Sequence, residues 1–233
     1  MCLCLSGGDY DAALAQGKIA AFLALEGAEG IDCDPGRLED LFEMGFRMVT
    51  LTWNANNALA GCAKEDGPGL TRQGREFVRR AQALGMLVDV SHISDRAFWD
   101  VLDTAEKPVV ASHSNSRAMC SHWRNLTDQQ FQALCVHGGS AGINLYGMFL
   151  TMDGTAGLEH VYRHIDHFME LGGEGHVALG GDLDGCDRLP RGFKGLKDYE
   201  KLAAFLERKG YTGETIQQIY SNTLKRIVTL CTM

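Results

Sequence analysis

The chain has 233 residues, of which 45% are hydrophobic and 22% charged, and 22 basic against 30 acidic side chains give a formal net charge of −8. A protein with a pI near 5.4 has no long-range attraction for nucleic acids or anionic lipids, which excludes both as expected partners. The composition is typical of a globular protein and excludes disorder as the main state. No segment approaches the roughly 18 consecutive apolar residues of a membrane span, and the N-terminal segment lacks a signal-peptide pattern, so we expect a soluble, cytoplasmic protein.

Six short apolar segments in chain order are predicted to be buried strands. Near-continuous apolar runs of this kind are typical of parallel strands that are covered on both faces. They span residues 19–25, 47–52, 86–91, 108–112, 140–145 and 177–181. Polar stretches with helical periodicity follow them and predict helices over residues 35–44, 71–84, 94–104, 127–137, 156–171, 196–208 and 213–230.

The alternation of strands and helices predicts βα units with right-handed crossovers, in either a doubly wound sheet or a (β/α) barrel. No proline-rich or Gly/Ser-rich linker divides the chain, so we expect residues 1–233 to form one domain. The six predicted strands are fewer than the eight of a complete barrel, which takes about 250 residues.

Eight cysteines are scattered along the chain without a C-x-x-C pair. A disulfide framework or a zinc ribbon would need paired spacing, so we expect reduced thiols that are mostly packed as small apolar groups.

Polar residues stand at the carboxyl ends of four predicted strands. Glu26 ends the first, His92 and His113 follow the third and fourth, and Asp182 follows the last. Parallel α/β folds place their active sites at this edge of the sheet. Two imidazoles and a carboxylate are the ligand types of a catalytic zinc site with a position left for water, and Asp182 would then handle protons.

Each of these residues also has a simpler interpretation. Glu26 could be a solvated loop acid, either histidine could be hydrogen-bonded within a turn, and Asp182 could cap a turn. The glycines of segment 180–185 could suggest a phosphate loop of a phosphosugar enzyme. Two acidic residues in that loop, Asp182 and Asp184, oppose an anion, and no nucleotide-binding motif is present.

Six segments in order along the chain carry a more specific signal. They are Gly17–Gly27, Gly69–Gly74, Leu84–Ser94, Ser112–Ala118, Arg124–Asp128 and Gly180–Gly185. In sequence and in spacing these segments resemble the membrane dipeptidase (renal dipeptidase) family of zinc peptidases. The resemblance covers nearly the whole chain, and it implies a (β/α)8 barrel of the amidohydrolase type and the hydrolysis of dipeptides.

The resemblance also implies roles for the residues at the strand ends. In the family a glutamate bridges two zinc ions, and Glu26 matches it. His92 and His113 match the two histidines that complete one zinc site. Asp182 matches an aspartate that acts on the bridging water and on the substrate amine.

Two further residues are candidates for substrate binding. Arg124 matches the arginine that binds the substrate carboxylate, a task that suits the guanidinium fork, although beside Trp123 and Asn125 it could equally be a surface loop residue. Tyr146, near the end of the fifth predicted strand, is either a substrate contact or a packing residue.

The chain departs from the family pattern in two ways. The family's first strand carries a His-x-Asp pair that completes the other zinc site, and no predicted strand of this chain carries such a pair. The six predicted strands therefore correspond to barrel strands three to eight, and ligands for about one zinc ion remain. Trp53 stands where the family has a histidine that stabilises the tetrahedral intermediate, and an indole donates a hydrogen bond but carries no proton.

Two functions follow from this comparison. The first is a zinc-dependent dipeptidase, with activity reduced by the missing strands. The second is a truncated, non-catalytic relative that acts as a fold fragment or as a subunit of a homo-oligomer covering the open barrel edge.

Three further histidines lie on one face of a predicted helix. They are either a metal site or a stripe of packed residues, and we favour the packed stripe: His160, His164 and His167.

Overall fold

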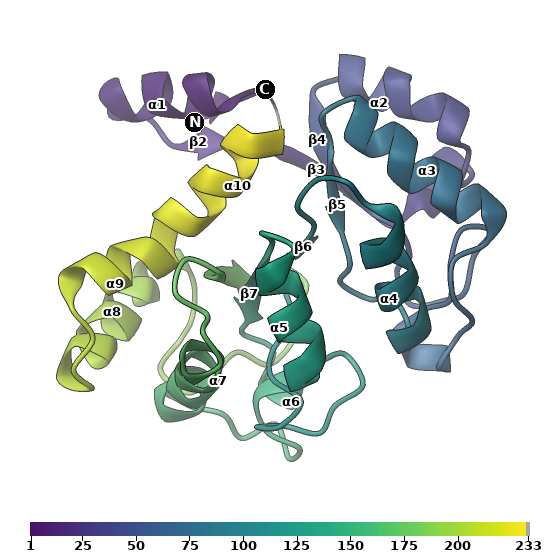
Figure 1. The fold of residues 1–233 in the computed structure, drawn as a ribbon. Coiled ribbons are helices and arrows are strands. Elements are labelled where there is room, and N and C mark those ends of the chain that lie inside the picture. The colour runs from purple at the N-terminus through teal and green to yellow at the C-terminus, as the bar shows by residue number, and fades with distance from the viewer. Residues whose placement is uncertain (232–233) are drawn as a thin grey trace. The chain divides into compact units, whose positions relative to one another are not determined.

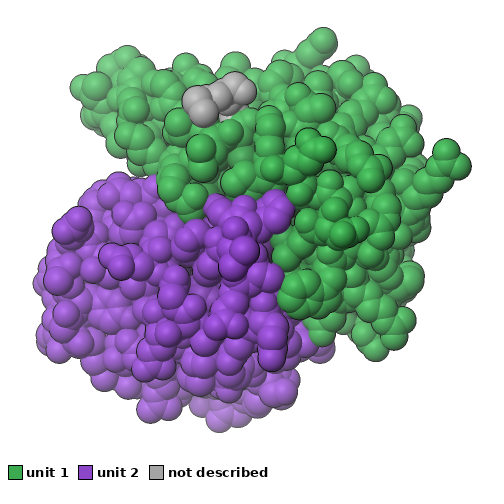
Figure 2. Space-filling view, viewed as in Figure 1, with its two compact units in different colours: residues 1–110, 225–233 green, residues 111–224 purple. Residues whose placement is uncertain are grey.

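The computed structural model describes residues 1–231, which pack as two compact units. Residues 1–110 and the C-terminal segment from Lys225 form the first unit, and residues 111–224 form the second (Figure 2). A single domain can contain two compact units, so the expectation of one domain stays a prediction.

The first unit contains three neighbouring parallel strands, β3 (Leu23–Glu26), β4 (Phe46–Thr50) and β5 (Leu87–Asp89). β5 also pairs with the start of β6 (Val110–Ala111). Helices α2 (Leu38–Glu43), α3 (Arg72–Ala83) and α4 (Asp95–Thr104) pack along these strands (Figure 1).

Side-chain caps explain where the two longer helices of this unit begin. Thr71 accepts a hydrogen bond from the Gly74 amide at the start of α3, and Ser94 accepts one from the Ala97 amide at the start of α4. The buried face of α3 carries Phe77, which is fully buried. These caps and the apolar face fix the crossover helices that follow β4 and β5.

The N-terminal segment forms structure that the apolar pattern does not predict. β1 (Cys2–Leu3) pairs in parallel with β2 (Ala20–Ala21), and α1 (Gly7–Ala15) connects them. Segment 19–25, expected as one strand, is therefore divided at Phe22 into β2 and β3. Ser6 caps α1 by accepting from the Asp9 amide, a local signal at this helix start.

The second unit contains the parallel pair β7 (Ser140–Asn144) and β8 (Val177–Gly181). Phe131 of α5 stacks on Phe168 of α7 with ring centroids 3.9 Å apart. Its helices are α5 (Asp128–Val136), α6 (Gly147–Leu150), α7 (Leu158–Glu170), α8 (Tyr199–Arg208) and α9 (Gly213–Gln217). The predicted helix 213–230 is interrupted by a π-helical segment, Gln218–Asn222, before α10 (Thr223–Cys231).

Strands that are adjacent in the six-stranded sheet are also adjacent in the chain, in the order β3 to β8. The pairs β3–β4, β4–β5, β5–β6 and β7–β8 are parallel. This order is that of consecutive (β/α) barrel units and excludes the doubly wound alternative, in which the strand order reverses. All six predicted strands are thus confirmed. The chain has an α/β fold that corresponds to part of a barrel.

Two other expectations can be compared with the structure. All eight cysteines are free, five of them buried, as expected for reduced packing residues. Among residues 1–231, no helix combines the length and the apolar character that crossing a membrane requires.

The three histidines of α7 have structural partners, as the packed-stripe interpretation predicts. His160 accepts from the Gly157 amide, and His167 lies 2.8 Å from an Asp128 carboxylate oxygen. His164 is buried between the Ser116 amide and the Leu150 carbonyl. The triplet 164–166 has the His-x-Asp spacing, but it lies on this helix, where the His164 ring is already engaged on both nitrogens.

Burial of His164 predicts a pH-dependent stability. Desolvation lowers the pKa of this imidazole to about 4 in the folded chain. Between about pH 6.5 and pH 4, His164 therefore binds a proton in the unfolded chain but not in the folded chain. Stability is therefore full above pH 6.5 and falls towards pH 4, by about 3 kcal/mol at most for this group. Urea unfolding of the wild type and of His164→Gln should show a shallower acid slope in the variant, whereas His160→Gln on the same helix should keep the wild-type slope.

Candidate active site

The register of the parallel strands aligns the site residues of the first unit across the sheet. Glu26 pairs with Thr50, and Thr50 pairs with Asp89, so these three residues lie at one level near the carboxyl ends of β3, β4 and β5. His92 stands three residues after Asp89. Its Nε2 lies 2.9 Å from Glu26 Oε1, with the histidine side chain 9% exposed and the glutamate 46%. The structure thus brings these two predicted ligands into direct contact.

The turn that carries His92 is held tightly. Asp89 accepts hydrogen bonds from the Ser91 amide at 2.9 Å and from the Thr50 hydroxyl at 2.7 Å. The Ala63 amide donates to the His92 carbonyl at 2.7 Å. These contacts keep His92 at φ 69°, a left-handed conformation that costs a non-glycine residue about 1–3 kcal/mol. Such strain is common at functional sites and fixes where the imidazole points.

His113 lies near the start of the second unit, three residues after Val110, which pairs with Asp89 of β5. His113 and His92 therefore each stand three residues after one member of the pair Asp89 and Val110. The Ser112 hydroxyl lies 2.7 Å from His113 Nδ1, and this contact orients the ring.

Two glycines allow the His113 segment to approach the strands beside it. A Cβ at Gly142 of β7 would lie 2.0 Å from the Ser112 carbonyl oxygen, and one at Gly180 of β8 would lie 2.5 Å from the same atom and 2.9 Å from His113 Cα. The Ser114 amide also donates to the Gly142 carbonyl at 2.8 Å. Close backbone packing against β7 and β8 thus fixes the position of His113.

Among the described residues, Glu26, His92 and His113 form a group that could hold a metal ion. Each offers one ligand atom, and these atoms lie within 4.8 Å of one another. Ligands about 2.1 Å from a tetrahedral zinc ion are about 3.4 Å apart, so the group is close to the required size. Two imidazole nitrogens and one carboxylate oxygen also form a donor set that zinc accepts, so the residues fit the ion.

Asp182 directly follows β8 and turns the chain, with φ 59° after Gly181 at φ 57°. Its Oδ2 accepts a hydrogen bond from Asn144 Nδ2 at 3.1 Å, and its carbonyl accepts from the Gly185 amide. The segment therefore forms a turn through its backbone, while the Asp182 side chain is hydrogen-bonded to Asn144. Asn144 was not a predicted site residue, because nothing in the sequence of a buried strand end distinguishes such an amide from a structural one.

A thiol in the same loop faces Asp182. Burial, together with the nearby Asp182 carboxylate, raises the pKa of Cys186 to about 12. The thiol is therefore protonated at neutral pH and adds no negative charge beside Asp182.

Arg124 is buried, with 3% of its surface exposed, so the interpretation as a surface loop residue is wrong. Its guanidinium donates to the His113 carbonyl at 3.2 Å and to the Ser114 hydroxyl at 3.4 Å, and it lies over the Phe149 ring at 5.4 Å. These contacts place a cation directly beside the His113 backbone.

Tyr146 is half-buried and precedes α6, with its ring edge-on to Phe149 at 4.8 Å. Its amide donates to Asn144 Oδ1 at 2.6 Å. Burial and then the nearby Asp187 carboxylate raise the pKa of its phenol, which keeps the hydroxyl protonated. Tyr146 therefore shares a partner with Asp182, and its role as a substrate contact stays a prediction.

Trp53 lies in the first unit, three residues after Thr50, the same spacing that separates His92 from Asp89. It is 55% exposed, and a Cβ at Gly27 would lie 3.3 Å from its Cβ. The indole therefore stands beside Gly27, the residue that follows Glu26.

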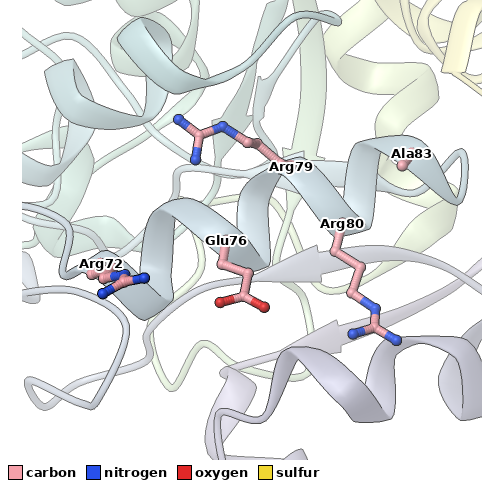
Figure 3. Close-up of a pocket in the computed structure, with 5 residues that line it drawn as sticks. All are labelled: Arg72, Glu76, Arg79, Arg80 and Ala83. Carbon is pink, nitrogen blue, oxygen red and sulfur yellow. The ribbon is translucent and has the colours of Figure 1, made fainter.

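A surface hollow of about 460 Å³ lies along α3 and contains none of the predicted site residues. Figure 3 shows Arg72, Glu76, Arg79 and Arg80 projecting from this one helix around it. Arg80 is already paired with Glu39 at 2.8 Å. The hollow is an open helix surface and is separate from the residues described above.

Comparison with known proteins agrees with the resemblance seen in the sequence. Residues 1–231 match the family described as membrane dipeptidase (Peptidase family M19). An uncharacterised Klebsiella pneumoniae protein encoded in the pqqA 5′ region is 36% identical over 220 residues, which are 90% of this chain and 81% of that protein. An uncharacterised dipeptidase of Schizosaccharomyces pombe is 34% identical over 91% of this chain, but the match spans only 53% of the yeast protein.

A solved structure provides a further comparison. A metallo-peptidase from Rhodobacter sphaeroides, liganded with a phosphinate mimic of the dipeptide L-Ala-D-Ala, superposes with a TM-score of 0.93 at 29% identity. The match covers 99% of this chain and 68% of that protein. The relatives therefore contain segments that have no counterpart in this chain.

Proposed function

Because the chain belongs to the membrane dipeptidase family of metallo-peptidases, we propose that it hydrolyses the peptide bond of dipeptides at a metal site formed by Glu26, His92 and His113. The observation that carries the proposal is the grouping of these three side chains at the carboxyl ends of their strands. Their separate positions in the sequence make such a grouping improbable for residues that only cap turns.

We propose zinc as the metal, with one well-occupied position. A divalent ion held there supplies Lewis-acid chemistry, since it lowers the pKa of a water to about 7 and polarises a carbonyl. The donor set of two imidazoles and one carboxylate supports zinc over magnesium or calcium, which prefer oxygen ligands. Ser112, through His113 Nδ1, keeps one ligand ring oriented.

Asp182 and Arg124 act on the substrate in this proposal. The Asp182 carboxylate accepts a proton and binds the substrate amine, which its ordered hydrogen bond to Asn144 supports. The Arg124 guanidinium neutralises the free carboxylate of the dipeptide, and its burial makes that interaction strong. Tyr146 contacts the substrate from the loop after β7.

A dipeptide assay tests the proposal against the non-catalytic alternative. Purified chain supplied with zinc should hydrolyse L-Ala-D-Ala, the dipeptide mimicked by the ligand of the Rhodobacter relative, and a chelator should abolish turnover. Asp182→Asn should remove most of the activity without changing the thermal midpoint. A folded, zinc-loaded sample that turns over no dipeptide would instead support the non-catalytic relative.

The edge strand β3 supports the proposal of a homo-oligomer. Within residues 1–231, β3 is at one end of the strand order and has β4 as its single neighbour. Leu23 on this strand is 38% exposed, and Ile19, directly before β2, is 66% exposed. We propose that a second copy of the chain covers this edge, since unpaired strand edges favour association. Sedimentation should give a dimer that Leu23→Lys dissociates, and a wild-type monomer at micromolar concentration would contradict it.

Cytoplasmic location is also part of the proposal. Eight free cysteines, including the pair Cys2 and Cys4, are typical of a chain kept in a reducing compartment.

A further inference from the structure

We propose that Asn144 is a positioning residue that holds both Asp182 and Tyr146 in place for the reaction. The inference rests on the proposed dipeptidase function, in which these two residues act on the substrate. It concerns a residue that touches neither the metal ligands nor the substrate in that proposal.

The Asn144 backbone is fixed by a second buried amide. The Asn144 amide donates to Asn115 Oδ1 at 2.8 Å, and Asn115 Nδ2 donates to the Asn144 carbonyl at 3.0 Å. Both side chains are completely buried. Because buried polar groups are costly to leave unpaired, this exchange of two hydrogen bonds allows Asn144 a single position.

The strand register directs the Asn144 side chain towards the turn after β8. Ile143 pairs with Leu179, but the next residue, Asn144, pairs with Gly181, so Gly180 is an extra residue on β8. A bulge of this kind bends the strand and redirects the following side chains. As a result Asn144 lies opposite the residue that precedes Asp182.

The two polar atoms of the Asn144 side-chain amide form hydrogen bonds with two different site residues. Nδ2 donates to Asp182 Oδ2 at 3.1 Å, and Oδ1 accepts from the Tyr146 amide at 2.6 Å. A carboxylate only accepts and a backbone N–H only donates, so these partners also settle which end of the amide is the oxygen. Among the side chains of this size, only asparagine provides a donor for Asp182 and an acceptor for Tyr146.

This double contact matters because the Asp182 turn has few other restraints on its side chain. Asp182 lies in the left-handed region, and its backbone is tied to Gly185. Loss of the Asn144 donor removes the hydrogen bond to Oδ2 and leaves the Cys186 thiol as the side-chain partner of Asp182, so the carboxylate is freer to rotate. Removal of such an outer hydrogen bond typically costs 10–100-fold in activity.

A double-mutant cycle tests the inference. Asn144→Asp keeps the shape and the acceptor for Tyr146 but removes the donor to Asp182, and it should lower kcat/KM by about 10–100-fold. In an Asp182→Ala background the same change should have an effect of less than about two-fold, because Asn144 then has no carboxylate to position. Equal losses in both backgrounds would overturn the inference and leave the proposed function intact.

Gln130→Ala is the matched control for stability. Gln130 is also a buried amide of the second unit, and it accepts from the Thr127 amide at the start of α5, far from Asp182 in the sequence. The Gln130→Ala substitution should lower the melting temperature, and it should reduce kcat/KM by the same factor in the wild-type and Asp182→Ala backgrounds. Zinc content per chain should stay unchanged in all of these variants.

A crystal structure of Asn144→Asp provides a readout that needs no activity. The inference predicts that the Asp182 side chain leaves its wild-type position, whereas the Tyr146 amide keeps its contact with residue 144. An Asp182 carboxylate that keeps its position in the variant would overturn the inference, even if the wild type hydrolysed no dipeptide and the proposed function had failed.

Discussion

His92→Ala is expected to lower kcat/KM for a dipeptide by at least about 10³-fold and to remove bound zinc. The imidazole lies 2.9 Å from the Glu26 carboxylate, so one substitution removes a ligand and breaks a direct contact within the group. A metal ion contributes several kcal/mol to the stabilisation of charge in the transition state, and about 4 kcal/mol corresponds to about 10³ in rate. Zinc per chain after desalting, measured with the dipeptide assay, checks both expectations.

Glu29→Gln is the matched control for a change of charge near this group. Glu29 is an exposed acid three residues after Glu26, and its carboxylate accepts from Asn57 Nδ2 at 2.8 Å. It should leave zinc content and kcat/KM within about two-fold, because it lies outside the ligand group. If Glu29→Gln and His92→Ala lost zinc equally, general electrostatics rather than direct ligation would hold the ion.

The backbone at His92 adds a second readout for the same site. Its φ of 69° disfavours any residue with a Cβ, so His92→Gly should be more stable than His92→Ala by about 1 kcal/mol although both lose the metal. Urea unfolding of the two metal-free variants measures this difference. Equal stabilities would show that the turn relaxes once the imidazole is absent.

The strands could be predicted from the sequence because each lies within a run of residues that are nearly all apolar. Segment 177–181 is confirmed over its full length, and segment 140–145 differs from β7 by one residue. The break at Phe22 was not predicted, because the apolar run continues through it while the pairing changes from β1 to β4. Hydrophobic pattern reports burial, whereas pairing partners depend on residues far away in the chain.

The site was predictable to the extent that it follows from strand register. Glu26 is itself an aligned residue of β3, and His92 and His113 each stand three residues after an aligned position of β5 or β6, a spacing that the sequence shows once the strands are predicted. Asn144 and Gly180 could not be found in this way. Their importance depends on a one-residue shift in the pairing of β7 with β8, and nothing in either segment marks that shift.

Arg124→Met is expected to lower kcat/KM by about 10²-fold for a dipeptide with a free carboxylate and much less for the same dipeptide as its C-terminal amide. Methionine keeps most of the apolar contact with Phe149 but removes the charge. The guanidinium is 3% exposed, and a charged pair at such a site is stronger than one in water. The ratio of kcat/KM between the two substrates therefore isolates the carboxylate interaction from any general damage.

Arg124→Lys and Arg163→Met separate charge, geometry and background effects. Lysine keeps the charge but cannot form the forked contacts to His113 and Ser114, so it should recover only part of the preference for the free carboxylate. Arg163 is 60% exposed on α7, and its loss should leave the preference unchanged. A wild-type enzyme that hydrolysed the free dipeptide and its amide equally well would show that Arg124 binds no substrate carboxylate, and its buried guanidinium would then serve only to support the His113 backbone.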